Sequence, residues 1–136
     1  MNNNLLKSAE AHYYKRNFQK AIALYSQIIT KSPQHSEAYL GRALAYYALL
    51  DIPQALENCT LAIQFDAENH NAFFNRALIR LDQQKFQAAI PDLEKAISIY
   101  GESIYYLANS AYAHFCLKNY DQAIHYSLQL LSLDSA

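Results

Sequence analysis

A spacing of 34 residues aligns the chain with itself over four successive segments, and this repeat limits the fold more than any other feature. Two columns of the alignment contain only alanine, and several others are apolar throughout. The alanine columns are Ala9, Ala43, Ala77 and Ala111, and Ala21, Ala55, Ala89 and Ala123. A period of this length indicates stacked units, each of which buries its apolar face against a neighbour. The repeats are predicted at 2–35, 36–69, 70–103 and 104–136, within one domain over 1–136.

Each repeat is predicted to hold two antiparallel helices, so the fold class is all-α. Phe18, Ala21, Ile22 and Tyr25 have the spacing of one helix face. Small residues such as Ala9 and Ala21 let two helix axes approach closely, and we expect these two to meet. The residues just before the second helices are mostly types that cap helices: Asn17, Asp51, Lys85 and Asn119.

Proline and glycine mark the expected helix ends. Pro33 and Gly101 are predicted to follow the second helices of their repeats. Pro53 falls in a first turn, where its missing N–H costs little. Pro91 lies deeper in its helix, and we expect a mild kink there.

Composition excludes several classes of protein. The 136 residues include only two glycines and three prolines, too few for a sandwich or barrel or for a glycine-rich phosphate loop. The net charge of −1 argues against nucleic-acid binding, and there is no apolar run long enough for a signal peptide or a membrane span. Cys59 and Cys116 are expected to be reduced thiols, and the protein to be cytoplasmic.

No group of side chains predicts catalysis, a metal site or a cofactor. The five histidines are scattered, and the sequence lacks the Cys and His spacings of zinc sites. His12 and His114 share a repeat column with Tyr46 and Arg80, which favours a half-buried packing position. We therefore expect a protein that is not an enzyme.

The repeat resembles that of the tetratricopeptide family, most clearly at residues 13–22 and 43–47. The resemblance implies an α-solenoid in a right-handed superhelix, whose first helices line a concave groove that binds a peptide or partner segment. It covers nearly the whole chain. The departures are local, for example Leu107 in place of an aromatic residue.

Carried over position by position, the resemblance assigns a set of partner-binding residues that is rich in aromatic and aliphatic side chains. The set is Leu6, Glu10, Tyr13, Tyr14, Leu40, Leu44, Tyr47, Asn71, Phe74, Asn75, Leu78, Leu81, Tyr105, Asn109, Tyr112 and Phe115. Tyrosine is favoured at interfaces, and the Asn75 and Asn109 amides can bond a peptide backbone. We expect an apolar or aromatic partner segment, helical or extended.

The same resemblance argues against one ligand. Family members that grip the acidic C-terminal tails of heat-shock chaperones use lysine, arginine and asparagine side chains. Here Leu6 and Glu10 stand in the first repeat, and Asn71 and Asn75 in the third. We expect no tight binding of such tails.

Charge is unevenly divided among the repeats, and the last helix is expected to lack a covering helix. The first repeat has a net charge of +4 and the second of −4. No polar capping helix is evident after the fourth repeat, which would leave apolar residues uncovered: Tyr126, Leu130, Leu131 and Leu133. We expect self-association through them.

The sequence therefore predicts an adaptor or chaperone-like module that binds protein partners. Two alternatives remain: a self-assembling structural unit, and a regulatory fragment of a larger protein.

Overall fold

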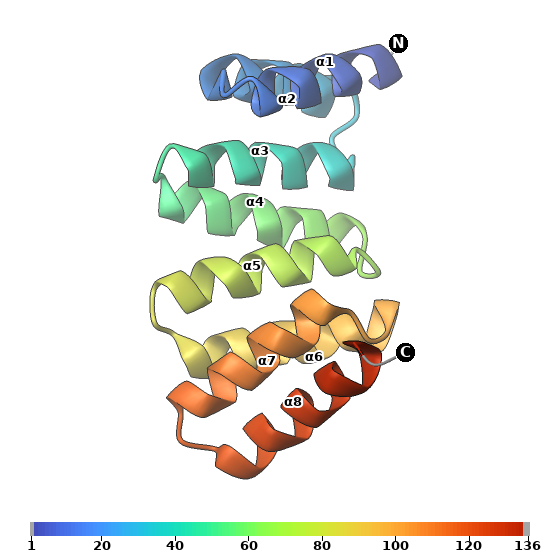
Figure 1. Ribbon diagram of the computed structural model, residues 1–136. Helices are drawn as coiled ribbons and strands as arrows, with labels where there is room; N and C mark the ends of the chain where they lie inside the picture. The colour runs from blue at the N-terminus through green and yellow to red at the C-terminus, as the bar shows by residue number, and fades with distance from the viewer. Residues whose placement is uncertain (1, 135–136) are drawn as a thin grey trace. The chain divides into compact units, whose positions relative to one another are not determined.

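The computed structural model describes residues 2–134, and over this range all regular structure is helical (Figure 1). The helices are α1 (Asn2–Tyr14), α2 (Phe18–Lys31), α3 (Ser36–Ala48), α4 (Ile52–Phe65), α5 (His70–Asp82), α6 (Phe86–Tyr100), α7 (Ile104–Cys116) and α8 (Tyr120–Asp134). The first helices begin at residues 2, 36, 70 and 104, so the period of the sequence is kept to the residue. The predicted all-α fold of four helical hairpins is confirmed.

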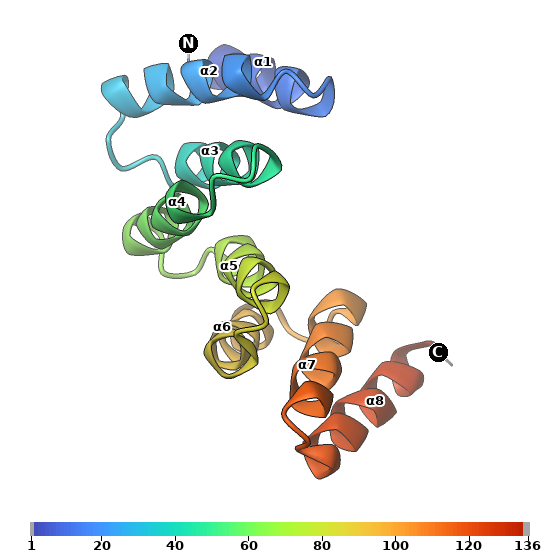
Figure 2. The ribbon, with the colours of Figure 1, turned by 90° about the vertical axis from the view of Figure 1, so that its left-hand side faces the viewer.

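The chain divides into two compact units, Met1–Ala72 and Phe73–Ala136, with the boundary in the first turn of α5. In the first unit α2 packs against both α1 and α3, and α3 packs against α4. In the second unit α7 packs against both α6 and α8. The two views agree that α3 and α4 form one antiparallel hairpin and α7 and α8 another (Figures 1 and 2).

The turn inside each repeat has one backbone conformation, used four times. Arg16, Leu50, Gln84 and Lys118 are left-handed, with φ of 66°, 63°, 61° and 63°. In the first repeat the amide of Asn17 donates to the carbonyl of His12 at 2.8 Å, and that of Arg16 to Tyr13 at 2.9 Å. Equivalent bonds follow α3, α5 and α7, which is the Schellman pattern. Each turn therefore holds a non-glycine residue in a conformation that costs about 1–2 kcal/mol.

The predicted caps of the second helices are correct only in part. Asp51 accepts a hydrogen bond from the amide of Gln54 at 3.3 Å, as expected of a cap. Asn17 precedes α2 but makes no side-chain cap. Its Nδ2 lies instead 3.4 Å from Nδ1 of His12, across the turn. The cap prediction is therefore wrong for Asn17, whose side chain contacts the preceding helix instead.

Three first helices have side-chain caps that were not predicted from the sequence. One repeat position supplies them all, with a side chain that accepts a hydrogen bond from an amide in the first turn. The pairs are His35 with Ala38 at 3.2 Å, Asn69 with Ala72 at 3.1 Å and Ser103 with Tyr105 at 3.3 Å. Asparagine and serine are ordinary capping residues, so two of the three were readable from sequence.

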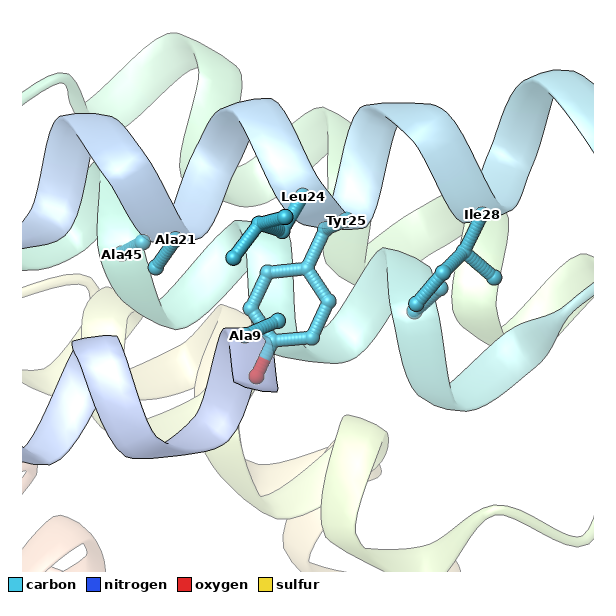
Figure 3. Close-up of a cluster of buried hydrophobic side chains, with 7 residues drawn as sticks. Ala9, Ala21, Leu24, Tyr25, Ile28 and Ala45 are labelled. Carbon is cyan, nitrogen blue, oxygen red and sulfur yellow. The ribbon is translucent and has the colours of Figure 1, made fainter. Parts of the chain in front are cut away.

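The alanine columns lie in the core, as predicted. Ala9 and Ala21 are fully buried in one cluster, where Tyr25 and Ile28 of α2 and Ala45 of α3 join them (Figure 3). In the second unit a cluster forms around a second pair of column alanines: Ala77, Leu81, Ala89, Leu93 and Ala113. One column member differs. Ala111 is only half-buried.

Proline and glycine lie where the sequence placed them. Helix α2 ends at Lys31, two residues before Pro33, and Pro53 stands at the start of α4. Helix α6 ends at Tyr100, and Gly101 follows with φ of 105°. Pro91 is inside α6, which stays helical from Phe86 to Tyr100. The expected kink at Pro91 stays a prediction.

Candidate functional site

In the first unit the expected partner-binding residues lie on α1 and α3 and differ in exposure. Tyr14 is 80% exposed, and Glu10 is exposed beside it on α1. The ring of Tyr13 packs edge-on against Tyr14 with centroids 5.4 Å apart. The remaining apolar members are half-buried: Leu6, Tyr13, Leu40, Leu44 and Tyr47. Asn71, on the first turn of α5, is exposed. The accessible aromatic surface of this unit is thus mainly that of Tyr14.

In the second unit the expected residues of α7 are the most accessible. Tyr105 is 66% exposed, Phe115 is 61% exposed, and Tyr112 is half-exposed. The members on α5 and one on α7 are half-buried: Phe74, Asn75, Leu78 and Asn109. Phe74 packs on the buried Tyr106, with ring centroids 4.8 Å apart. Helix α7 therefore exposes three aromatic side chains: Tyr105, Tyr112 and Phe115.

One expected contact residue belongs to the core. Leu81 is only 7% exposed and packs in the cluster with Ala77 and Leu93. Its side chain has too little free surface to bind a partner. We therefore remove Leu81 from the set. The helix period alone did not separate it from its exposed counterpart in α7, Phe115, because both occupy one repeat column.

Two aromatic residues of the second helices extend the exposed surface of α7. The ring of Tyr120 packs edge-on against Phe115 with centroids 5.9 Å apart, and Phe86 packs in the same way against Tyr112. Neither residue is in the expected set, because that set contains residues of first helices only. The available signal was their position five residues after the column of Leu81 and Phe115, directly across the turn.

The polar residues of this surface are partly engaged. Asn109 donates one N–H of its side-chain amide to the carbonyl of Tyr105 at 2.7 Å. A hydrogen bond with the Cys116 thiol raises the pKa of the Tyr112 phenol. Tyr112 therefore stays neutral at physiological pH and presents a polar tip without charge.

The first unit also contains a buried phenol outside the expected contact set, that of Tyr25. Tyr25 of α2 is almost fully buried, and its ring lies against Gly41 of α3. Burial, with the nearby Glu10 carboxylate as a second cause, raises the pKa of Tyr25 to about 12.

Charge is unevenly spread over the first two repeats. All five basic residues of the first repeat are exposed: Lys7, Lys15, Arg16, Lys20 and Lys31. The second repeat carries five acids, and its single base, Arg42, is half-buried, where its Nε donates to Asn58 at 2.8 Å.

Helix α8 exposes apolar residues, but not all those that the sequence indicated. Leu131 is exposed, whereas Leu130 and Leu133 are half-buried. The ring of Tyr126 stacks on His114 with centroids 5.6 Å apart. The exposed apolar side chains of α8 also include Ile124 and Leu128. Self-association through this helix stays a prediction.

Within residues 2–134, no cluster of three or more His, Cys, Asp or Glu side chains could hold a metal ion. Over the same range, no helix has both the length and the apolar character needed to cross a membrane. An open cavity of about 490 Å³ is lined by residues of the loop between α2 and α3: Ser32, Pro33, Gln34 and His35. These residues are not members of the expected contact set.

Comparison with known proteins identifies the repeat in the sequence and the fold in the structure. Two models described as tetratricopeptide repeat match residues 6–70 and 70–102. Human serine/threonine-protein phosphatase 5 is 32% identical over 95 residues, covering 69% of this chain and 19% of the phosphatase. The DnaJ homolog subfamily C member 7 homolog of Dictyostelium discoideum is 28% identical over 97 residues, covering 68% of this chain and 18% of that protein. The chain thus spans about a fifth of the length of these curated relatives.

Solved structures share the fold at lower sequence identity. The crystal structure of MamA has a TM-score of 0.91 and 20% identity, covering 98% of this chain and 78% of MamA. The first TPR of Spaghetti (RPAP3), bound to the HSP90 peptide SRMEEVD, has a TM-score of 0.81 and 20% identity, covering 86% and 93%. With four hairpins in one register and two matching family models, the chain belongs to the tetratricopeptide repeat family.

Proposed function

We propose that this chain is a non-enzymatic interaction module, an adaptor or chaperone-like unit, that binds an apolar or aromatic segment of a protein partner on its first helices. The observation that carries the proposal is the exposure of Tyr14, Tyr105, Tyr112 and Phe115. These side chains lie on first helices, outside the core clusters. Tyrosine and phenylalanine are large and have few rotatable bonds, so ordering them costs little when a partner covers them.

The free energy gained by burying these aromatic side chains is large enough for specific binding. An aromatic side chain buries about 150–250 Å² when fully covered. At about 25 cal/mol per Å², the three rings of α7, each half covered, contribute several kcal/mol against the cost of association. The affinity then depends on how many rings one segment covers at once.

We further propose that acidic chaperone tails are not the ligand. Glu10 is exposed on α1 and would repel an acidic tail, and Leu6 offers no charge to attract one. The RPAP3 domain with the same fold binds an HSP90 peptide, so the fold alone does not exclude this ligand. A difference in ligand between the RPAP3 domain and this chain must therefore come from their side chains.

The test is selection of peptides from a random library on the wild-type chain, followed by anisotropy titration of the selected peptides. We expect apolar or aromatic peptides whose binding weakens at least tenfold in Tyr105→Ala and Phe115→Ala. The matched control is Leu128→Ala, which removes an equally exposed apolar side chain from α8. Equal binding by all three variants would falsify the proposal. Low-micromolar binding of an EEVD peptide would overturn the statement on acidic tails.

A second candidate function is self-assembly through α8. It is favoured by three exposed apolar side chains on that helix, Ile124, Leu128 and Leu131. Sedimentation equilibrium tests it. A dimer that Leu131→Asp converts to monomer supports this function, and a wild-type monomer at high concentration excludes it.

A further inference from the structure

Tyr25 of α2 is a buried residue whose hydroxyl group has no hydrogen-bond partner in the described part of the fold. Its side chain is 3% exposed, and its ring packs in the cluster of Ala9, Ala21 and Ile28. Among residues 2–134 its hydroxyl forms no hydrogen bond, yet no wholly buried polar side-chain atom in that range lacks a partner. The hydroxyl oxygen is therefore not wholly buried, whereas the ring stays inside. Figure 3 shows the ring extending from α2 past Ala9, with the oxygen at its far end.

Gly41 makes room for this ring. A Cβ atom at position 41 would lie 2.6 Å from the Tyr25 hydroxyl oxygen and 2.5 Å from a ring carbon. Both distances are far below van der Waals contact, and the ring is held by the core. Glycine inside a helix such as α3 destabilises it by about 1 kcal/mol relative to alanine. One of only two glycines in the chain thus stands where it weakens a helix and admits the phenol.

The hydroxyl emerges between α1 and α3, among residues of the expected contact set. Glu10, Tyr13 and Tyr14 of α1 are close enough to influence its ionisation, and Gly41 bounds it on α3. The phenol thus comes from the second helix of the first repeat and opens onto the faces of two first helices.

The surroundings of the hydroxyl select the kind of group it can bind. With a pKa of about 12 the phenol stays protonated at physiological pH and can donate a hydrogen bond. The Glu10 carboxylate, for which no ion pair is found in the described residues, disfavours an anionic acceptor here. A neutral carbonyl oxygen is left as the complementary acceptor, and an extended or irregular peptide segment supplies one at each residue.

We propose that the Tyr25 hydroxyl, admitted by Gly41, donates a hydrogen bond to a main-chain carbonyl of the partner segment and so fixes the register of that segment on the first unit. This inference rests on the proposed function and adds a polar contact to a surface otherwise made of rings and aliphatic side chains. It also assigns a role in binding to a second helix.

The experiment uses the peptides selected on the wild-type chain and compares Tyr25→Phe with Tyr39→Phe. Both variants remove one hydroxyl from a buried tyrosine. The Tyr39 hydroxyl donates to the carbonyl of Pro33 at 2.8 Å and is structural. We expect Tyr25→Phe to weaken peptide binding about three- to tenfold with the melting temperature unchanged. We expect Tyr39→Phe to lower the melting temperature and leave the affinity unchanged.

An ester scan identifies the acceptor. Replacing one peptide amide by an ester weakens the carbonyl of the residue before it as an acceptor. At one position this should reduce binding to the wild type and not to Tyr25→Phe. Equal affinity of wild type and Tyr25→Phe overturns the inference, and so does dependence of the Tyr25 contact on a peptide carboxylate. If Tyr14→Ala weakens binding while Tyr25→Phe does not, the inference fails and the proposed function stands. If no peptide is selected, both fail.

Discussion

The guanidinium of Arg76 donates two hydrogen bonds to the buried carboxylate of Asp92, from Nε at 2.9 Å and from Nη2 at 2.7 Å. Arg80 donates a third from Nη1 at 2.8 Å. One buried acid of α6 therefore holds two arginines of α5. Charged hydrogen bonds in this forked geometry are among the strong ones in proteins.

Replacing Asp92 by asparagine should be strongly destabilising, because the two guanidinium groups would lose the buried carboxylate that both of them contact. Removing one partner of a buried ion pair costs about 3–5 kcal/mol, and we expect about 3 because both arginines are partly exposed. Urea unfolding followed by circular dichroism measures the change. The matched control, Glu94→Gln on the same helix, is exposed and should change stability by less than about 0.5 kcal/mol. Equal effects of the two substitutions would show that the ion pairs of Asp92 contribute nothing to the free energy of unfolding.

Replacing Leu50 by glycine should stabilise the chain by about 0.5–1 kcal/mol. Leu50 has φ of 63° and is 80% exposed, so the change relieves backbone strain without removing a buried side chain. Thermal unfolding measures the gain. Leu50→Ala is the control, since it shortens the side chain and keeps the strain. A gain of the same size in both variants would mean that exposure of the leucine, and not its backbone, is the cause.

Replacing Ala55 by leucine should lower the free energy of unfolding by about 1–3 kcal/mol. Ala55 is fully buried, so the added atoms have no free space to occupy. The control is Ala48→Leu, because Ala48 is exposed at the end of α3. An unchanged melting temperature for Ala55→Leu would contradict the close helix approach inferred from the alanine columns.

The stability of the wild type should fall relative to Tyr25→Phe as pH rises from 10 to 12. Folding raises the pKa of Tyr25 from 10 to about 12, so the folded state favours the protonated phenol. That preference contributes fully below pH 10 and is lost as pH passes through the folded pKa. A shift of two units corresponds to about 2–3 kcal/mol. Urea unfolding at several pH values measures the difference between the two proteins, and parallel curves would show that Tyr25 ionises freely in the fold.

The helices were predictable because their ends depend on local interactions. Each turn repeats one left-handed residue and one pair of backbone hydrogen bonds, and neither requires contact with a distant part of the chain. Asn17 and Lys85 make no side-chain cap, and the Nδ2 of Asn17 lies instead 3.4 Å from Nδ1 of His12. The candidate contact set was less predictable, since Leu81 and Phe115 share a repeat column and only Leu81 is buried.

The 34-residue period by itself determined the number of hairpins and the bounds of the first helices, because identical spacing imposes the same local geometry on each repeat. Tertiary packing decided what each repeated position does. The positions that hold Arg80 and Asp92 as an ion pair hold His114 and Tyr126 as stacked rings one repeat later. Tyr25 and Gly41 are apart in sequence and meet only when α2 packs on α3. The repeat in the sequence therefore fixes the position of each side chain along its helix. The residues that the side chain contacts depend on which helices pack together in the fold.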